Sequence, residues 1–169
     1  DPVTPNTIYA GLYQGGVFKS TNGGTTWSAI NTGMRTTPES NRDGVLINPK
    51  KLPLTVHALA IDPQIPTTVY AATKGGGVYK STNAGTSWSE VNTGLTDGQD
   101  PRQPLGGLHA ITVTIDPQTP STLYGATYGK GILKSTNGWV SLACTVLRCE
   151  VKSTHLGQTS TIPERMRME

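Results

Sequence analysis

The sequence predicts an all-β fold in which three four-stranded antiparallel repeats form β-propeller blades of an incomplete ring. Three observations support this prediction. Segments 1–34, 62–95 and 116–149 repeat one pattern, and the first two are identical at 20 of their 34 positions. Within each repeat, short runs rich in β-branched and aromatic residues alternate with turns that contain glycine, proline or asparagine. No segment shows the periodicity of an amphipathic helix, so four short strands per repeat indicate a blade.

The second repeat shows the expected order of the elements. Residues 56–61 form a short, mostly apolar run, which predicts the first strand of a blade. Residues 62–66 read Asp-Pro-Gln-Ile-Pro and predict a turn, because proline fixes φ and lacks a backbone donor. The other three strands are expected at residues 68–73, 78–82 and 86–92, separated by turns at 74–77 and 83–85.

The repeats divide the chain into four parts. Blade 1, which lacks its first strand, and its connector occupy residues 1–50, blade 2 and its connector 51–107, blade 3 residues 108–151, and a polar, basic tail 152–169. Three blades cannot close a ring, so the outer flanks would expose strand edges and apolar surface. We therefore expect that the chain is part of a larger propeller or that it forms a homo-oligomer, in which two copies complete a six-bladed ring.

A serine motif with the pattern Ser-x-Asn-x-Gly-x-x-Trp ends the third predicted strand of blades 1 and 2. The short polar side chain accepts hydrogen bonds from turn amides, glycine permits positive φ, and the indole packs between neighbouring blades. Because every repeat carries the motif, we expect a structural turn rather than a ligand or metal site. The motif residues are Ser20, Asn22, Gly24 and Trp27, then Ser81, Asn83, Gly85 and Trp88, and in blade 3 Ser135 and Asn137.

This motif resembles the Asp box, or BNR repeat, in which aspartate usually stands where this chain has asparagine. The resemblance covers most of the chain. It implies a propeller of the sialidase-like, xyloglucanase-like, sortilin-like or photosystem-assembly-factor-like kind. Asparagine keeps an acceptor oxygen for the turn but loses the charge. Sialidase activity has no support, because none of the arginines outside the basic tail lies in a motif that matches the sialidase arginine cluster.

The third repeat departs from the pattern after Gly138, since Trp139 comes three positions early. Either a frameshift or an altered terminus has replaced the expected sequence, or residues 142–151 form a genuine last strand followed by a frayed tail. The sequence also leaves two possibilities for the oxidation state of Cys144 and Cys149. They form an intrachain disulfide, or they stay reduced because cysteines at this spacing on one extended strand lie beyond disulfide reach.

Antiparallel strand order places two sets of turns on opposite faces of a blade. The Asp-Pro turns and the serine motifs share one face and barely vary. We call the other the glycine-loop face, which holds loops at 12–16, 73–77 and 127–131 and connectors at 35–51 and 96–107. Because binding residues generally lie on variable loops over a rigid scaffold, we expect function on the glycine-loop face.

The ligand-binding candidates on the glycine-loop face are aromatic and basic. Tyr13 and Tyr128 occupy equivalent positions of their repeats, where their rings can stack on sugars. The alternative is that both are ordinary exposed loop tyrosines without a ligand. Lys74 and Lys130 either give this face a positive rim or are ordinary solvated surface lysines. The full set of candidates is Tyr13, Lys74, Tyr128, Lys130, Arg35, Arg42 and Arg102.

The connectors also hold candidates for catalysis, namely Asp97, Asp100 and Asp43. Two carboxyl groups at a suitable separation act as acid and base in glycoside hydrolysis. The alternative is that these residues hydrogen-bond their own backbone in turns. The sequence does not decide whether the chain is an enzyme, and glycoside hydrolysis is the expected reaction if it is one.

Other features exclude several classes of protein. A net charge of +3 with scattered basic residues excludes strongly electrostatic nucleic-acid binding. No apolar run approaches the roughly 18 residues of a membrane-spanning helix. The three histidines and two cysteines lack metal-ligand spacing, so we expect no metal and no cofactor. The equivalent lysines Lys19, Lys80 and Lys134 are expected to point outward and to solubilise the sheet.

Together with the resemblance, these features predict a non-catalytic module that presents loops to a glycan or a protein in an extracellular or periplasmic setting. One alternative is a fragment or relative of an Asp-box glycoside hydrolase that acts on a polysaccharide. Another is an assembly factor with a protein client. The sequence does not choose the ligand.

Overall fold

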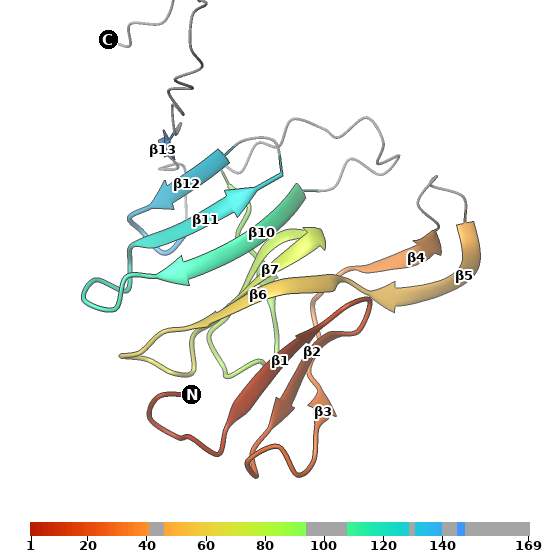
Figure 1. Ribbon diagram of the computed structural model, residues 1–169, viewed down its shortest axis with the longest axis horizontal. Coiled ribbons are helices and arrows are strands. Elements are labelled where there is room, and N and C mark those ends of the chain that lie inside the picture. Colours follow the sequence, from red (N-terminus) through yellow and green to blue (C-terminus); the bar gives the residue numbers. More distant parts are fainter. Residues whose placement is uncertain (41–45, 94–107, 129–130, 140–144, 148–169) are drawn as a thin grey trace, which may run out of the picture.

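The computed structural model describes residues 1–40, 46–93, 108–128, 131–139 and 145–147. Every helix or strand in this part of the chain is a β-strand, and the paired strands are antiparallel (Figure 1). Over the same residues, no helix is long and apolar enough to cross a membrane. The predicted all-β class is therefore confirmed.

Blade 2 is an antiparallel sheet of β6 (Thr55–Ile61), β7 (Val69–Gly75), β8 (Gly77–Ser81) and β9 (Ser89–Glu90), in that order. Its first turn is closed by Asp62, whose carboxylate accepts two hydrogen bonds from turn amides at 2.9 and 3.0 Å. The fourth strand is shorter than the expected 86–92. The reason is that the amide of Ser87 donates a hydrogen bond to the Asn83 side chain, and this bond holds residues 83–87 in the turn.

Blades 1 and 3 repeat this arrangement. Blade 1 contains β1 (Ile8–Leu12), β2 (Gly16–Ser20) and β3 (Ser28–Ala29). Blade 3 contains β10 (Leu108–Ile115), β11 (Leu123–Thr127), β12 (Gly131–Ser135) and β13 (Thr145–Leu147). Strand β13 falls within the span 142–151, where a last strand was one of the two expectations. Cys144 and Cys149 lie outside the described residues, as does the tail.

The connector that follows blade 1 contains an element that the sequence did not predict. Strands β4 (Thr36–Ser40) and β5 (Leu46–Pro53) form a two-stranded antiparallel hairpin. Pro38 and Pro49 lie within these strands, although proline is rare inside paired strands. A hairpin outside the blades tolerates both, because each of its strands has an edge where no backbone donor is required.

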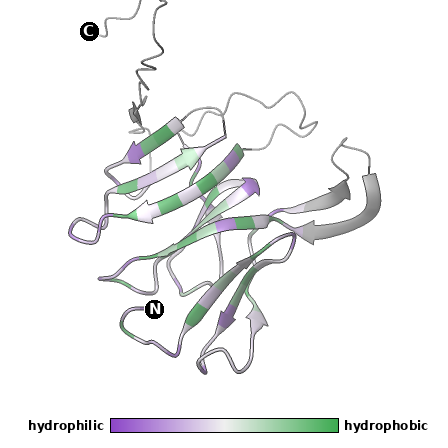
Figure 2. Cartoon of the chain, in the orientation of Figure 1, coloured by the Kyte–Doolittle hydropathy of each residue, from purple (hydrophilic) through white to green (hydrophobic). Residues whose placement is uncertain are grey.

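An apolar core lies between each pair of neighbouring blades and packs them together. Successive residues of β7 point to opposite sides of blade 2, so Val69 and Ala71 pack toward blade 1 whereas Tyr70 and Ala72 pack toward blade 3. In Figure 2, hydrophobic residues likewise recur along β1 and β10 between paler ones. The core between blades 1 and 2 consists of Val17, Met34, Leu54, Val56, Val69, Ala71, Tyr79 and Trp88. The core between blades 2 and 3 consists of Tyr70, Ala72, Val78, Ala110, Val113, Leu123, Leu133 and Trp139.

The two tryptophans of the serine motifs differ in burial. Trp88 is 3% exposed, and its indole N–H donates to the carbonyl of Ile30 in blade 1 at 2.6 Å. Trp27 is 40% exposed, and its indole N–H donates to Gly24 of its own turn at 3.0 Å. The expected packing between blades therefore occurs at Trp88. Trp27 would need a further blade on its side, and no described residue occupies that place.

Candidate ligand-binding face

The structure places the turns of the three blades at two ends, as the strand order requires. In Figure 1 the turn between β1 and β2, the end of β7 and the end of β11 lie on the right. The turns between β6 and β7 and between β10 and β11 lie on the left. The loops grouped as the glycine-loop face thus share one end of the molecule.

Tyr13, Lys74 and Tyr128 are exposed on the glycine-loop face, and the backbone at each position is held by hydrogen bonds or strand pairing. Tyr13 is 74% exposed and Tyr128 is 53% exposed. The amide after Tyr13 donates to the Thr55 hydroxyl at 3.0 Å, and the amide of Tyr128 donates to the carbonyl of His109 at 3.0 Å. Lys74 pairs with Thr55 on one side and with His109 on the other. These side chains therefore project into solvent from fixed positions.

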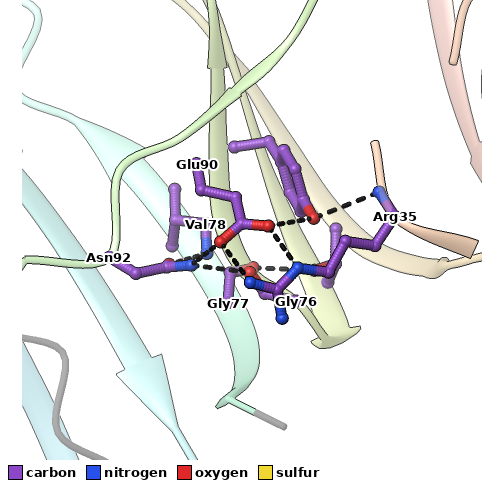
Figure 3. Close-up of polar contacts among 8 residues, drawn as sticks. Arg35, Gly76, Gly77, Val78, Glu90 and Asn92 are labelled. Carbon is purple, nitrogen blue, oxygen red and sulfur yellow. Dashed lines mark hydrogen bonds and ion pairs between the residues drawn. The ribbon is translucent and has the colours of Figure 1, made fainter. Parts of the chain in front are cut away.

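Arg35, a predicted ligand-binding residue, forms an ion pair with Glu90 (Figure 3). Its guanidinium donates to both carboxylate oxygens, with Nη2 2.9 Å from Oε2. The Arg35 amide also donates to the Tyr79 hydroxyl at 3.3 Å, and that hydroxyl donates to Glu90 at 3.1 Å. The Arg35 side chain remains largely exposed, but its charge is already matched by Glu90. Its first role is thus to join the connector of blade 1 to blade 2.

Burial, reinforced by the neighbouring Glu90 carboxylate, raises the pKa of the Tyr79 hydroxyl to about 12. The hydroxyl is therefore a neutral hydrogen-bond donor across the physiological range. Asn92 completes the group, since its side chain donates to the carbonyl of Gly76 and accepts from the amide of Val78, each at 2.8 Å. Figure 3 shows that these contacts fix the glycine loop between β7 and β8.

Sequence reasoning missed Glu90 and Tyr79 as parts of this group. One signal was present, because Glu90 stands where the first repeat has Ala29 while the residues around it repeat. A charged residue that breaks a repeat is a candidate for a contact that the repeat does not make. The partner was less visible, because Arg35 is 55 residues away in the chain.

The acidic side chains that the structure describes are all engaged. Asp1, Asp62 and Asp116 each accept hydrogen bonds from amides of their own turns. Glu90 is paired with Arg35. None of these four carboxylates is placed opposite another as an acid–base pair requires. Several predicted residues lie outside the described residues, namely the catalytic candidates Asp43, Asp97 and Asp100 and the basic candidates Arg42, Arg102 and Lys130.

The serine motifs hydrogen-bond their own backbone at the opposite end. Ser81 Oγ accepts the amide of Gly85 at 2.9 Å and donates to Asn83 Oδ1 at 2.9 Å, and Asn83 Oδ1 also accepts the amide of Ser87. The motif of blade 1 has the same contacts. In blade 3, Trp139 takes the glycine position with a φ of 54° and donates its amide to Ser135 Oγ at 2.9 Å. Within the described chain, no group of three His, Cys, Asp or Glu side chains could hold a metal ion.

Comparison with known proteins places these features among propellers. No protein-family model matches the chain. The chain is 28% identical over 153 residues to a xyloglucanase of Hypocrea jecorina (strain QM6a), which covers 84% of this chain and 16% of that protein. YCF48 from Cyanidioschyzon merolae superposes with a TM-score of 0.50 at 18% identity, over 83% of this chain and 33% of that one. The GH74 xyloglucanase from Xanthomonas campestris gives a TM-score of 0.42 at 17% identity, over 85% and 29%.

The likeness to YCF48, together with the all-β structure, shows the class of fold. The chain consists of β-propeller blades, as the sequence predicted. It spans 16% of the length of the xyloglucanase and 33% of that of YCF48, so the blades correspond to part of each.

Proposed function

We propose that the chain is an Asp-box propeller module that binds a glycan on its glycine-loop face without catalysis, in an extracellular or periplasmic setting. The observation that carries the proposal is the placement of Tyr13 and Tyr128. Both are exposed and both occupy the same position of their repeats. The backbone next to Tyr13 is fixed by Thr55 of blade 2, and that of Tyr128 is fixed by His109 of its own blade. Rigid aromatic rings of this kind supply contact area at little entropic cost.

A glucan of the xyloglucan type is the ligand class with most support, because the similarity in sequence is to a xyloglucanase. Sugar rings present an apolar face that stacks on an aromatic ring, while their hydroxyls need polar partners. Lys74 lies on the strand end between blades 1 and 3 and supplies such a donor.

Titration calorimetry with xyloglucan oligosaccharides tests the proposal. We expect Tyr13→Ala and Tyr128→Ala each to weaken binding about tenfold, or ~1.4 kcal/mol, whereas the corresponding phenylalanine variants keep most of the affinity. Ile65→Ala is the matched control, because Ile65 is exposed on an Asp-Pro turn at the opposite end. Equal affinity for the tyrosine variants and the native chain contradicts the proposal.

The second candidate is a relative of a glycoside hydrolase, favoured by the same similarity to a xyloglucanase. Release of reducing sugar from xyloglucan that disappears in Asp97→Ala or Asp100→Ala would establish hydrolysis and would replace the first proposal.

A further inference from the structure

The boundary between blades 2 and 3 receives one polar side chain from each blade at its glycine-loop end. Along β7, Tyr70 and Ala72 pack toward blade 3, so alternation places the Lys74 side chain on the same side. Along β11, Leu123 packs toward blade 2, and alternation places the Thr127 side chain on that side too. Lys74 and Thr127 therefore face the same boundary, which lies between two described blades.

Strand β10 brings these two positions close together. Its His109 pairs with Lys74 of β7, and its next residue, Ala110, pairs with Thr127 of β11. Two strand spacings, or about 10 Å, therefore separate the backbones of Lys74 and Thr127. One small group bound between the blades can contact both side chains.

The Thr127 hydroxyl is a buried donor without a partner. Thr127 is 8% exposed, and among the described residues its Oγ1 is a buried polar atom that makes no hydrogen bond. Its repeat equivalent in blade 2, Thr73, is also buried, but it donates to the carbonyl of Gly77 at 2.9 Å. Since an unpaired buried hydroxyl costs stability, the one at Thr127 points to an acceptor that a ligand supplies.

The Lys74 ammonium is a cation without a counter-charge among the described residues. Lys74 is exposed and has no ion-pair or hydrogen-bond partner there, whereas Arg35 is paired with Glu90. Lys19 also differs, because its ammonium donates to the carbonyl of Ala84 in blade 2 at 3.1 Å. The expectation that Lys19 only solubilises the sheet is therefore wrong, and Lys74 is the lysine that can pair with an anion.

The turn beside Lys74 leaves room for a ligand. Gly75 has a φ of 89°, and a Cβ added to it would meet no described atom within 4 Å. The same position of blade 1 is Gln14, which carries a side chain. Lys74 also stands at the repeat position that holds Tyr13 and Tyr128 in the other two blades. The cation thus lies in the row of the stacking tyrosines.

We propose that this boundary binds a carboxylate of the glycan, with Lys74 pairing with its charge and Thr127 donating to an oxygen that enters between the blades. The ligand is then an acidic glycan, a glucan-type chain in which one sugar carries a carboxylate. Both side chains are donors, and hydrogen bonds to a charged acceptor are roughly twice as strong as those to a neutral one. The inference rests on the proposed glycan binding, because Tyr13 and Tyr128 hold the chain over this boundary.

Titration calorimetry with a matched pair of ligands tests the inference. The pair is a neutral xyloglucan oligosaccharide and the same oligosaccharide with the primary alcohol of a branch sugar oxidised to a carboxylate. We expect the acidic form to bind about tenfold more tightly at low salt, with the preference falling as salt rises. Lys74→Tyr, which gives blade 2 the residue of the other blades, should abolish the preference. Lys134→Met removes the same charge from the side of β12 that faces away from blade 2, and should keep it.

Thr127 has a readout that a purely structural hydroxyl would not give. Thr127→Val keeps the shape of the side chain and removes the unpaired hydroxyl, so it should raise the Tm of the free chain by about 2–4 °C. It should also weaken binding of the acidic form about fivefold. Thr73→Val is the matched control, which should lower the Tm because the Gly77 carbonyl loses its donor, and which should keep the preference.

The possible contrary results separate this inference from the proposed function. Equal affinity of the native chain for the two forms overturns the inference and leaves glycan binding intact, whereas binding of neither form overturns both. A Thr127→Val chain that loses stability as Thr73→Val does also overturns it, because the hydroxyl would then already have a partner. An acidic peptide that binds more tightly than the acidic oligosaccharide overturns the assignment of the carboxylate to a glycan.

Discussion

Replacing Trp88 by alanine should cost more stability than the same change at Trp27, although both occupy one position of the repeat. Trp88 is 3% exposed and Trp27 is 40% exposed. A fully buried indole removes roughly 200 Å² from water, worth about 5 kcal/mol at about 25 cal/mol per Å². The partial burial of Trp27 is worth about 3 kcal/mol on the same scale. We therefore expect the two free energies of unfolding to differ by about 2 kcal/mol.

Thermal and urea unfolding followed by circular dichroism measure this difference. The chain must be studied at a concentration at which it sediments as one copy, so that no second copy covers Trp27. In a protein of this size, about 2 kcal/mol corresponds to a difference of about 4–8 °C in Tm. Trp88→Ala also removes the indole donor to Ile30 across the blade boundary, which adds to its cost. Equal losses of stability for Trp88→Ala and Trp27→Ala would refute the unequal packing of the two blades.

Three further changes test the turns and the Arg35 group. Ser81→Ala should lower the free energy of unfolding by about 2 kcal/mol in urea, because the buried amide of Gly85 loses its acceptor, and an unchanged midpoint contradicts this. Asn83→Asp should leave stability equal or higher by about 0.5 kcal/mol at pH 7, since a carboxylate accepts the same two donors and the Ser87 hydroxyl, which now accepts from Asn83 Nδ2, can donate to it instead; a large loss would contradict this reading. The raised pKa of Tyr79 stabilises the folded state fully below pH 10, and this contribution is lost as pH rises to about 12. Tyr79→Phe should therefore show a smaller loss of stability than the native chain between pH 10 and 12, and identical profiles count against a hydroxyl that is buried beside Glu90.

The strands of the blades could be predicted because their determinants are local. In blade 2, the strands expected at 56–61, 68–73 and 78–82 match β6, β7 and β8 within two residues at every boundary. The end of β6 and the end of β8 are each followed by a turn in which a side chain, Asp62 or Ser81, bonds nearby backbone. Such contacts span two to four residues and repeat, so the sequence displays them directly.

The contacts between blades were not predictable in the same way. Lys19 reaches Ala84 over 65 residues and Arg35 reaches Glu90 over 55, so no local pattern joins the partners. Strict repetition of the lysine was the only hint, and outward placement on a strand explained it equally well. The candidates on the glycine-loop face were easier to predict from the sequence, because the exposure of a loop tyrosine follows from strand order alone.

The claim that the glycine-loop face binds a glycan is tested most directly by amide chemical shifts of the labelled chain during titration with a xyloglucan oligosaccharide. We expect the largest changes at the backbone of Tyr13, Lys74 and Tyr128 and their neighbours. The turns at Asp62 and Ser81 should stay unchanged, because they lie at the opposite end. Changes confined to those turns, or no changes at all at saturating sugar, would contradict the account.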